Sequence, residues 1–442
     1  MAVSYARRLG LFSGTMSVIG GIIGAGIFLN PAIVAQRVGT PAATIGVWVG
    51  GGLVALIGAF IFGELGQRRP KVGGGYAYLR EAFGPFPAFL YAWALLLIIA
   101  PGAIAAVAVT AGNYGAVLFG VSPEVARPAA VTAILLLTLV NCLGVTFGAV
   151  TQNIFTVLKL AAIGMVVVAG LLALGTPAPA CLDCAAPVVP AGGGAMIGAV
   201  AAALVPVLFS YGGWQQTNFI AEEIIEPEKN LPRALVLGVV VVVLVYVLAN
   251  AAYLGALGVA GLAASSAPAA DTMEVLLGPA GRMVITAGIV FSTFGFLNLV
   301  ILVTPRVFQA MAADGLFFER FARLHPRFRT PVAAIIFLGV WSAILVYSGK
   351  YGALLDYVVF ADWIFFGVTA LTLLVFRRRD GMTGIRFSVP AFPVAMVIFV
   401  GVAGYVVVGS ILSNPGNALR GAGLLGLGLP VYLYWRSVGT RN

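Results

Sequence analysis

A glycine-rich stretch at residues 20–28 is the first segment of this sequence that could do chemistry. It reads GGIIGAGIF and places four glycines within seven residues, deep inside an apolar run. Glycine costs roughly 1 kcal/mol relative to alanine in a helix interior, so this stretch can unwind where protein or water satisfies its backbone. The helix that restarts near Ile27 would offer free N–H groups and a positive dipole end to a carboxylate. Close packing of two helices through glycine is the alternative interpretation.

A second polar interruption lies at residues 209–218, which read FSYGGWQQTN inside an otherwise apolar segment. Pro206 weakens the helix just before this interruption, because proline removes a backbone donor. Free carbonyl groups where one half-helix ends can hold an ammonium, while the free N–H groups of another half-helix hold a carboxylate. Together, two such breaks would make a site for a zwitterion, an α-amino acid.

The composition places both breaks inside a membrane. Of the 442 residues, 61% are hydrophobic and 9% are charged, and the mean hydropathy is +1.06. Soluble domains are about 45–50% apolar and about 25% charged. Apolar runs of about 18 residues or more recur, and each can cross a hydrocarbon core of ~30 Å as a helix. Because the ten-residue alternation of a β-barrel is missing, the sequence predicts an all-α polytopic membrane protein with about twelve transmembrane helices.

The breaks stand at matching places in the predicted order of spans. The apolar runs predict spans at 11–35, 42–67, 83–118, 128–149, 151–175, 195–220, 232–260, 279–311, 331–348, 352–376, 391–413 and 417–436. Interrupted first and sixth helices, in two halves of five spans, are typical of an inverted-repeat secondary transporter. We therefore expect one transporter domain over residues 1–442, with repeats at 11–175 and 195–376 and two additional helices at 391–436.

The basic residues indicate how the chain is oriented. The net charge is +10, and with the N-terminus inside, most of the cations fall in cytoplasmic segments. The basic residues of the outward segments are Arg37, Arg127, Arg282, Lys350 and Arg420. The positive-inside rule then predicts a protein of the inner (cytoplasmic) membrane with both termini in the cytoplasm. The excess of positive charge is explained by topology, and binding to nucleic acid is not needed.

Enzyme and metal chemistry have little support in the sequence. Its one histidine, His325, lies in a predicted cytoplasmic loop, where we expect it to cap local structure. Cys181 and Cys184 form a lone CxxC without further Cys or His nearby, which makes a poor zinc site. Two unpaired loop cysteines and a local disulfide remain the alternatives. An ion channel would need a filter of repeated carbonyls or charged rings. We therefore expect no enzyme activity and no cofactor.

Several motifs resemble a known family. Residues 21–28 (GIIGAGIF) resemble the first-helix signature of amino acid–polyamine–organocation transporters. FSYGGW at 209–214 resembles the L-type amino acid transporter branch, as do the segments 218–223 and 230–232, Trp93 with Pro101, 152–156 with Lys159, 304–306, 325–326 and 330–331. The resemblance implies a LeuT-like fold of ten helices in a five-plus-five inverted repeat, plus two more helices. It also implies sodium-independent transport or exchange of amino acids.

The resemblance also assigns site residues. It implies that Gly24, Ala25 and Gly26 give N–H groups to the substrate carboxylate. It implies that Ile22 and Phe209 offer carbonyls to the amine, and that the Phe209 ring is the gate that closes from outside. The other expected pocket residues are Gly212, Gly213, Gln215 and Trp363.

The sequence departs from the family pattern at two places. Many relatives carry Ser or Thr at the position of Ala25, so a hydroxyl contact to the carboxylate is missing here. The loop at 119–127 has no cysteine, whereas in the animal L-type branch a cysteine there links to a glycoprotein partner. A disulfide-linked heavy chain is therefore not expected.

Lys159 is an ionisable residue about eight residues into the predicted fifth span, which makes it a functional-site candidate. Its ammonium could snorkel to the cytoplasmic interface. Alternatively, it reaches unwound carbonyls of the first helix and polar groups of the eighth, such as Ser292 or Thr293. Sodium-coupled members of the implied fold hold a cation at that locus. A fixed lysine would exclude sodium there, and a proton-carrying role is the alternative.

The acidic residues complete the prediction. We expect Glu64, Glu222 and Glu223 to form interfacial ion pairs with arginines of the 68–80 or 320–329 loops. A role in the inner gate is the alternative. Asp362 lies deeper in the tenth span and receives no role. With no charged selector expected in the cavity, the predicted substrate is a neutral L-amino acid of unspecified size, moved by sodium-independent exchange. A proton-coupled symporter for neutral amino acids is the alternative.

Overall fold

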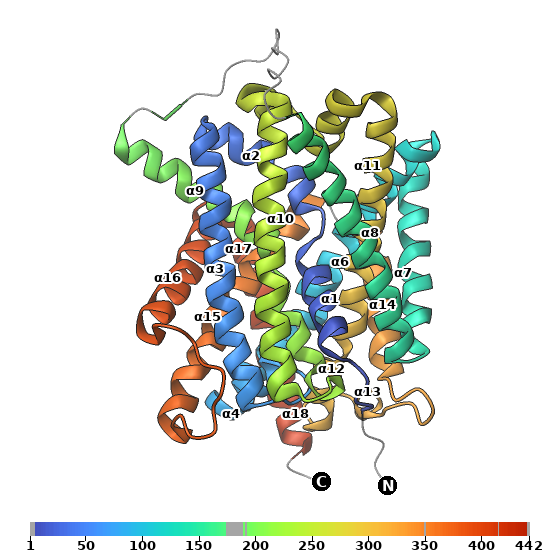
Figure 1. The fold of residues 1–442 in the computed structure, drawn as a ribbon. Helices are drawn as coiled ribbons and strands as arrows, with labels where there is room; N and C mark the ends of the chain where they lie inside the picture. Colours follow the sequence, from blue (N-terminus) through green and yellow to red (C-terminus); the bar gives the residue numbers. More distant parts are fainter. Residues whose placement is uncertain (1–4, 174–188, 191, 349–350, 414, 440–442) are drawn as a thin grey trace.

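The computed structural model describes residues 5–173, 189–190, 192–348, 351–413 and 415–439. Within these residues the chain forms helices and turns, and one isolated β-bridge joins Leu9 to Ile224. The long helices run side by side as one bundle, and α18 (Gly428–Gly439) lies at the same end as the segment that leads into α1 (Figure 1). We call this end the terminal end. Cys181 and Cys184 lie outside the described residues.

Nine helical segments of the described residues are long and apolar enough to cross a membrane. They are α3 (Pro41–Arg68), α5 to α6 (Pro85–Phe119), η2 with α7 (Pro123–Cys142), α8 (Val145–Leu172), α9 with η3 (Gly193–Glu223), α10 (Pro227–Ala264), α11 with α12 (Pro268–Ala313), Val358–Asp380 of α15 (Tyr351–Asp380) and Phe392–Leu412 of α16 (Phe392–Ser413). The pair α1 (Leu11–Ile22) and α2 (Gly26–Val38), bent by 44°, makes a tenth. The predicted all-α polytopic membrane fold is confirmed.

The remaining helices are shorter. α14 (Val332–Ser348) is apolar, and α4 (Gly75–Phe83) and α13 (Glu319–Ala322) are short connecting helices. The last predicted span, 417–436, is divided in the structure into α17 (Pro415–Gly426) and α18. Glycines stand at both sides of this division, at positions 426 and 428, and they weaken a continuous helix.

The predicted boundary between the fourth and fifth spans, at residues 149 and 151, is wrong. α7 (Ala126–Cys142) ends earlier and α8 begins at Val145. Gly144 turns the chain with φ 126°, a conformation that favours glycine. The apolar run continues through this turn, so hydropathy alone could not locate it. Lys159 is consequently the fifteenth residue of α8, counted from Val145, and lies near the middle of the helix.

A proline shapes the third span. Between α5 (Pro85–Ala94) and α6 (Ala100–Phe119) the helix widens into the π-helical turn η1 (Leu95–Ile99). Because Pro101 has no N–H, it cannot donate to the carbonyl of Leu97 as a helical residue would. Trp341 of α14 donates its indole N–H to that carbonyl at 3.2 Å. The widened turn is therefore satisfied by a neighbouring helix.

The two interrupted helices occupy the middle of the bundle. α1 packs against α8, α10 and α11, while α2 packs against α9 and α10 (Figure 1). At the terminal end, the N–H groups of Arg8 and Leu9 donate to the carbonyl of Glu223 at 2.9 and 3.0 Å. The N–H of Ile225 donates in return to the carbonyl of Leu9 at 2.8 Å. The segment before α1 is therefore tied to the end of η3.

Candidate functional site

The first break, between α1 and α2, leaves backbone donors uncovered. α1 ends at Ile22, and the N–H of Gly24 donates to the Ile22 carbonyl at 2.9 Å. No described group accepts a hydrogen bond from the N–H groups of Ala25, Gly26 or Ile27, as expected in the first turn of a helix. These three N–H groups and the positive end of the α2 dipole suit an anion. The N–H of Gly24, a predicted carboxylate donor, is already engaged.

The second break lies at Gly212 and Gly213, between α9 (Gly193–Tyr211) and the 3₁₀ helix η3 (Trp214–Glu223). Gly213 has φ 108°, which favours glycine. The N–H of Gly212 donates to the Phe209 carbonyl at 3.1 Å, and the N–H of Gly213 donates to Oε1 of Gln215 at 3.1 Å. A carbonyl oxygen has two acceptor positions, so the Phe209 carbonyl can still accept a bond from an ammonium.

Pro206 also affects the contact between α9 and α2. Since proline lacks an N–H, the carbonyl of Ala202 has no helical donor, and Arg37 of α2 donates its Nη1 to it. Asn30 of α2 donates through Nδ2 to Oγ of Ser210 at 2.8 Å and to the carbonyl of Pro206 at 2.9 Å. Side chains of α2 therefore hold the half of α9 that precedes the second break.

The two breaks pack directly against each other. A Cβ on Gly213 would overlap the carbonyl of Gly21, and a Cβ on Gly26 would lie 3.0 Å from the Cα of Ser210. The hydroxyl of Tyr246, on α10, lies 3.2 Å from the carbonyl of Ser210 and 3.2 Å from the carbonyl of Ile22, the last residue of α1. The sequence does not predict a role for Tyr246, because nothing local to α10 marks it.

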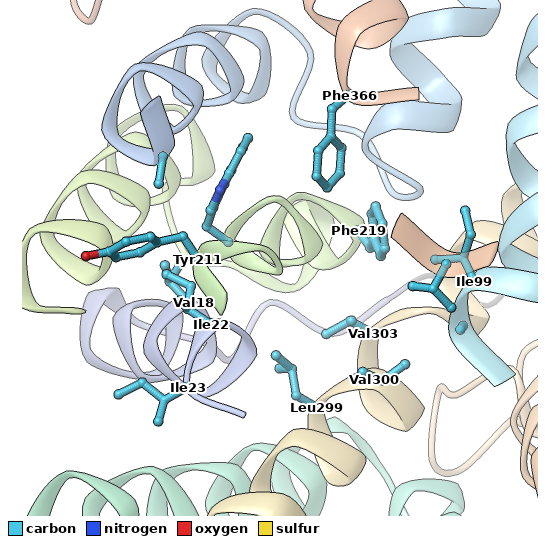
Figure 2. Close-up of a cluster of buried hydrophobic side chains, with 14 of the residues drawn as sticks. Val18, Ile22, Ile23, Ile99, Tyr211, Phe219, Leu299, Val300, Val303 and Phe366 are labelled. Atoms are coloured by element: carbon cyan, nitrogen blue, oxygen red, sulfur yellow. The ribbon is translucent and has the colours of Figure 1, made fainter. Parts of the chain in front are cut away.

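All nine residues predicted to bind substrate line one cavity of about 70 Å³ between the breaks. They are Ile22, Gly24, Ala25, Gly26, Phe209, Gly212, Gly213, Gln215 and Trp363. The rest of the wall is largely apolar, and Figure 2 shows Ile99, Phe219 and Phe366 approaching this region from η1, η3 and α15. Pockets for drug-sized ligands measure about 300 Å³ or more. The cavity is therefore closed in this conformation.

Lys159 lies outside the cavity wall, behind the first break. It is 0% exposed, so it does not snorkel to the interface. Its Nζ donates to the carbonyl of Ile23 at 2.6 Å and to that of Gly20 at 3.1 Å. Oγ of Ser292 donates to the same Ile23 carbonyl at 3.4 Å. The hydroxyl of Thr293 bonds instead to carbonyls of its own helix, so the structure joins Ser292 to this cluster and leaves Thr293 out.

The prediction of a cavity without a charged residue is wrong. Asp362 lines the wall beside Trp363, and Gln216 also lines it. The Oε1 of Gln216 is buried without a hydrogen-bond partner in the described structure. Val358, Asp362 and Phe366 recur every four residues and therefore share a helix face, but this spacing alone does not indicate which face of α15 points to the cavity.

The carboxylates at the terminal end form buried ion pairs. Glu64 accepts from Arg68 at 2.8 Å, as predicted, and also from Arg377 of α15. Glu223 pairs with Arg306 at 2.7 Å, and both side chains are 0% exposed. The predicted partner loops for Glu223 are therefore wrong, since Arg306 lies at the start of α12 (Pro305–Ala313).

Two further loop predictions have different outcomes. Glu222 accepts a hydrogen bond from the backbone N–H of Val72 at 3.1 Å, and it forms no ion pair within the described part of the chain. Nδ1 of His325 accepts bonds from the N–H groups of Arg327 and Phe328, both at 3.2 Å. His325 therefore caps local structure, as predicted.

Known proteins resemble this chain over most of its length. The profile of a family described as amino acid permease matches residues 9–421. The chain is 33% identical to the human b(0,+)-type amino acid transporter 1 over 418 residues, which make up 93% of this chain and 84% of that relative. It is 32% identical to the human large neutral amino acids transporter small subunit 2 over 452 residues, which cover 98% of this chain and 82% of that relative.

Proposed function

Because the chain belongs to the amino acid permease family, we propose that it moves neutral L-amino acids across the cytoplasmic membrane by sodium-independent exchange. One observation carries this proposal: free N–H groups at the start of α2 and the Phe209 carbonyl at the end of α9 belong to the same closed cavity. This pairing matches the carboxylate and the ammonium of a zwitterion and leaves the side chain to the cavity wall.

The hydrogen bonds refine the proposed roles. The substrate carboxylate binds the N–H groups of Ala25 and Gly26, which line the cavity and have no other acceptor among the described residues. The ammonium binds the Phe209 carbonyl. The Ile22 carbonyl already has the Gly24 N–H at 2.9 Å and the Tyr246 hydroxyl at 3.2 Å, so it accepts the ammonium only after one of these bonds opens.

Lys159 supports sodium independence. Carbonyls at the end of a helix can coordinate a cation, since they carry the negative end of the dipole. The ammonium of Lys159 lies 2.6 Å and 3.1 Å from two such carbonyls, those of Ile23 and Gly20. A covalently attached cation therefore occupies the place that sodium would need.

The proposed mechanism is alternating access. The cavity is too small and too enclosed to exchange substrate as it stands, so it opens to each side in turn, with the ring of Phe209 as the outer gate. We place the terminal end in the cytoplasm, because the basic loops gather there. We also propose that residues 11–175 and 195–376 are inverted repeats, followed by two helices at 391–436. The loop at 119–127 lacks a cysteine, so no disulfide-linked heavy chain is proposed.

Uptake of labelled alanine and leucine into proteoliposomes tests this function. The lumen is empty or preloaded with amino acid, and sodium and an inward proton gradient are each present or absent. Exchange predicts strong uptake into preloaded vesicles only, with or without sodium. Sodium-dependent uptake would contradict the role given to Lys159. Accumulation in empty vesicles driven by the proton gradient would favour the second candidate, a proton-coupled symporter, for which an uncompensated carboxylate in the cavity is the supporting observation.

A further inference from the structure

Asp362 is a carboxylate in the cavity wall with no basic side chain in the described structure to balance its charge. Its side chain is partly buried on α15, and no described residue forms a hydrogen bond or an ion pair with it. The lining of the cavity contains no lysine, arginine or histidine. Its neighbours on the same wall are Val358, Val359, Trp363 and Phe366. An ionised Asp362 would therefore face apolar groups when the cavity closes around a substrate and excludes water.

The charged groups of the surrounding helices do not reach Asp362. Glu64 of α3 pairs with Arg377, which lies fifteen positions beyond Asp362, or roughly 22 Å further along α15. Tyr91 of α5 interacts electrostatically with Asp362, but a phenol supplies no positive charge. η1, α6 and α16 contain no Asp, Glu, Lys, Arg or His. The ionisable side chains of α4 and α17 either bond to other residues or are exposed to solvent. They are Tyr76, Tyr78, Arg80, Glu81 and Arg420.

An unpaired ionised carboxylate is strongly disfavoured where water is excluded, and such a group takes up a proton instead. When the cavity opens, water can solvate the carboxylate and the proton can leave. Closure of the cavity around a substrate, which displaces the water, therefore favours a protonated Asp362, whereas each open state permits its ionisation. The same residue thus gains and loses a proton as access alternates.

We propose that Asp362 is the proton-binding residue of the transport cycle, and that the loaded cavity closes only when this carboxyl group is protonated. The proton enters from water on one side and returns to water on the other. Strict exchange then moves no net proton, because Asp362 crosses protonated in both directions. The slow net uptake into an empty vesicle carries a proton inward, because the unloaded carrier returns with Asp362 ionised and solvated by the water that replaces the substrate. This inference rests on the proposed function.

Lys159 is the other proton candidate, and its contacts assign it a different role. Its Nζ already donates to the carbonyls of Gly20 and Ile23, and it does not line the cavity. Loss of its proton would leave one of these carbonyls without a donor. The ammonium of Lys159 is therefore a fixed cation, and the proton that moves belongs to Asp362.

The test measures alanine movement and luminal pH in the same proteoliposomes, with a trapped pH-sensitive dye. Wild-type protein should acidify the lumen during net uptake, faster at lower external pH, and should show no acidification during exchange. Asp362→Asn imitates the protonated carboxyl and should keep exchange, while net uptake loses both the acidification and the pH dependence. Glu124→Gln removes one exposed carboxylate far from the cavity and should behave as wild type.

Each other outcome overturns the inference. Exchange without any net uptake, or net alanine uptake without acidification of the lumen, would refute it while leaving the proposed function intact, whereas no transport at all would refute both. Acidification that persists in Asp362→Asn would refute the inference. Competition of lysine with alanine in wild type but not in this variant would also refute it, because Asp362 would then bind the cationic side chain of a substrate. If Asp362→Asn does not fold, Asp362→Glu is used instead. This variant must keep the acidification of the lumen during net uptake, and the pH dependence of its uptake rate must be displaced from that of wild type. An unchanged pH dependence refutes the inference.

Discussion

Nζ of Lys159 lies 2.6 Å from the carbonyl oxygen of Ile23, the residue that follows the last turn of α1. The same Nζ lies 3.1 Å from the carbonyl of Gly20. The last carbonyls of a helix have no partner within it and carry the negative end of its dipole. The lysine of α8 therefore caps the broken end of α1 and stabilises the interrupted conformation.

Lys159→Ala should lower the initial rate of alanine exchange by about tenfold or more, because a buried hydrogen bond to a charged group contributes about 1.5–3 kcal/mol. The first break would lose its cap and close over the substrate less often. Lys229→Ala is the matched control, since Lys229 is exposed and pairs with Glu226 at the surface. Equal rates for both variants would show that the cap is not required.

Gly26→Ala should abolish exchange and lower the thermal stability of the purified protein. The added Cβ would lie 2.5 Å from Oγ and 3.0 Å from Cα of Ser210, so α2 and α9 must separate. Such overpacking typically costs about 1–3 kcal/mol. Gly46→Ala adds the same methyl group to α3, where nothing lies within 4 Å. If Gly26→Ala transported as well as Gly46→Ala, the close approach of the breaks would have no functional meaning.

Tyr246→Phe should weaken apparent substrate affinity about fivefold, because one hydroxyl near two backbone carbonyls contributes about 1 kcal/mol. The hydroxyl bridges Ser210 and the end of α1, so its loss loosens the geometry of the cavity without changing its lining. Competition between labelled and unlabelled alanine measures the effect. Tyr347→Phe, at an exposed site of α14, should leave the affinity unchanged, and equal affinities in both variants would argue against the bridge.

Glu223→Gln should lower the stability of the protein by about 3–5 kcal/mol, because it leaves Arg306 buried without its counter-charge. A fall in the melting temperature, measured by fluorescence in detergent, checks this expectation. Glu319→Gln breaks the exposed pair with Arg323 and should change stability by less than about 1 kcal/mol. Equal melting temperatures for the two variants would mean that Glu223 is protonated in the fold.

Much of the fold and of the site could be predicted from local sequence. Long apolar runs require helices in a bilayer, and glycines and polar residues within such runs mark the breaks. The site residues that the family resemblance assigns are mostly positions next to those breaks, such as Gly26 and Gly213, and they line the cavity. The end of α7 was missed because Gly144 turns the chain without a change in hydropathy.

Contacts between distant segments could not be predicted in this way. The Arg306–Glu223 and Arg37–Ala202 contacts join residues that are far apart in the chain, and only the packed helices bring them together. The sequence predicts that Asp362 lies deep in the tenth span, but the direction of its side chain depends on the rotation of α15 about its own axis. Hydropathy does not report that rotation when the helix is apolar on every side.

The hydrogen bonds around the two broken helices connect four half-helices in two pairs. Toward the terminal end, Leu9 and Glu223 connect the start of α1 to the end of η3. On the other side of the breaks, Asn30 and Ser210 connect α2 to α9. Each pair takes one half from each broken helix, so neither helix can bend alone. The glycines at 21 and 213 touch between the two pairs, so we expect both broken helices to rearrange together when the cavity opens.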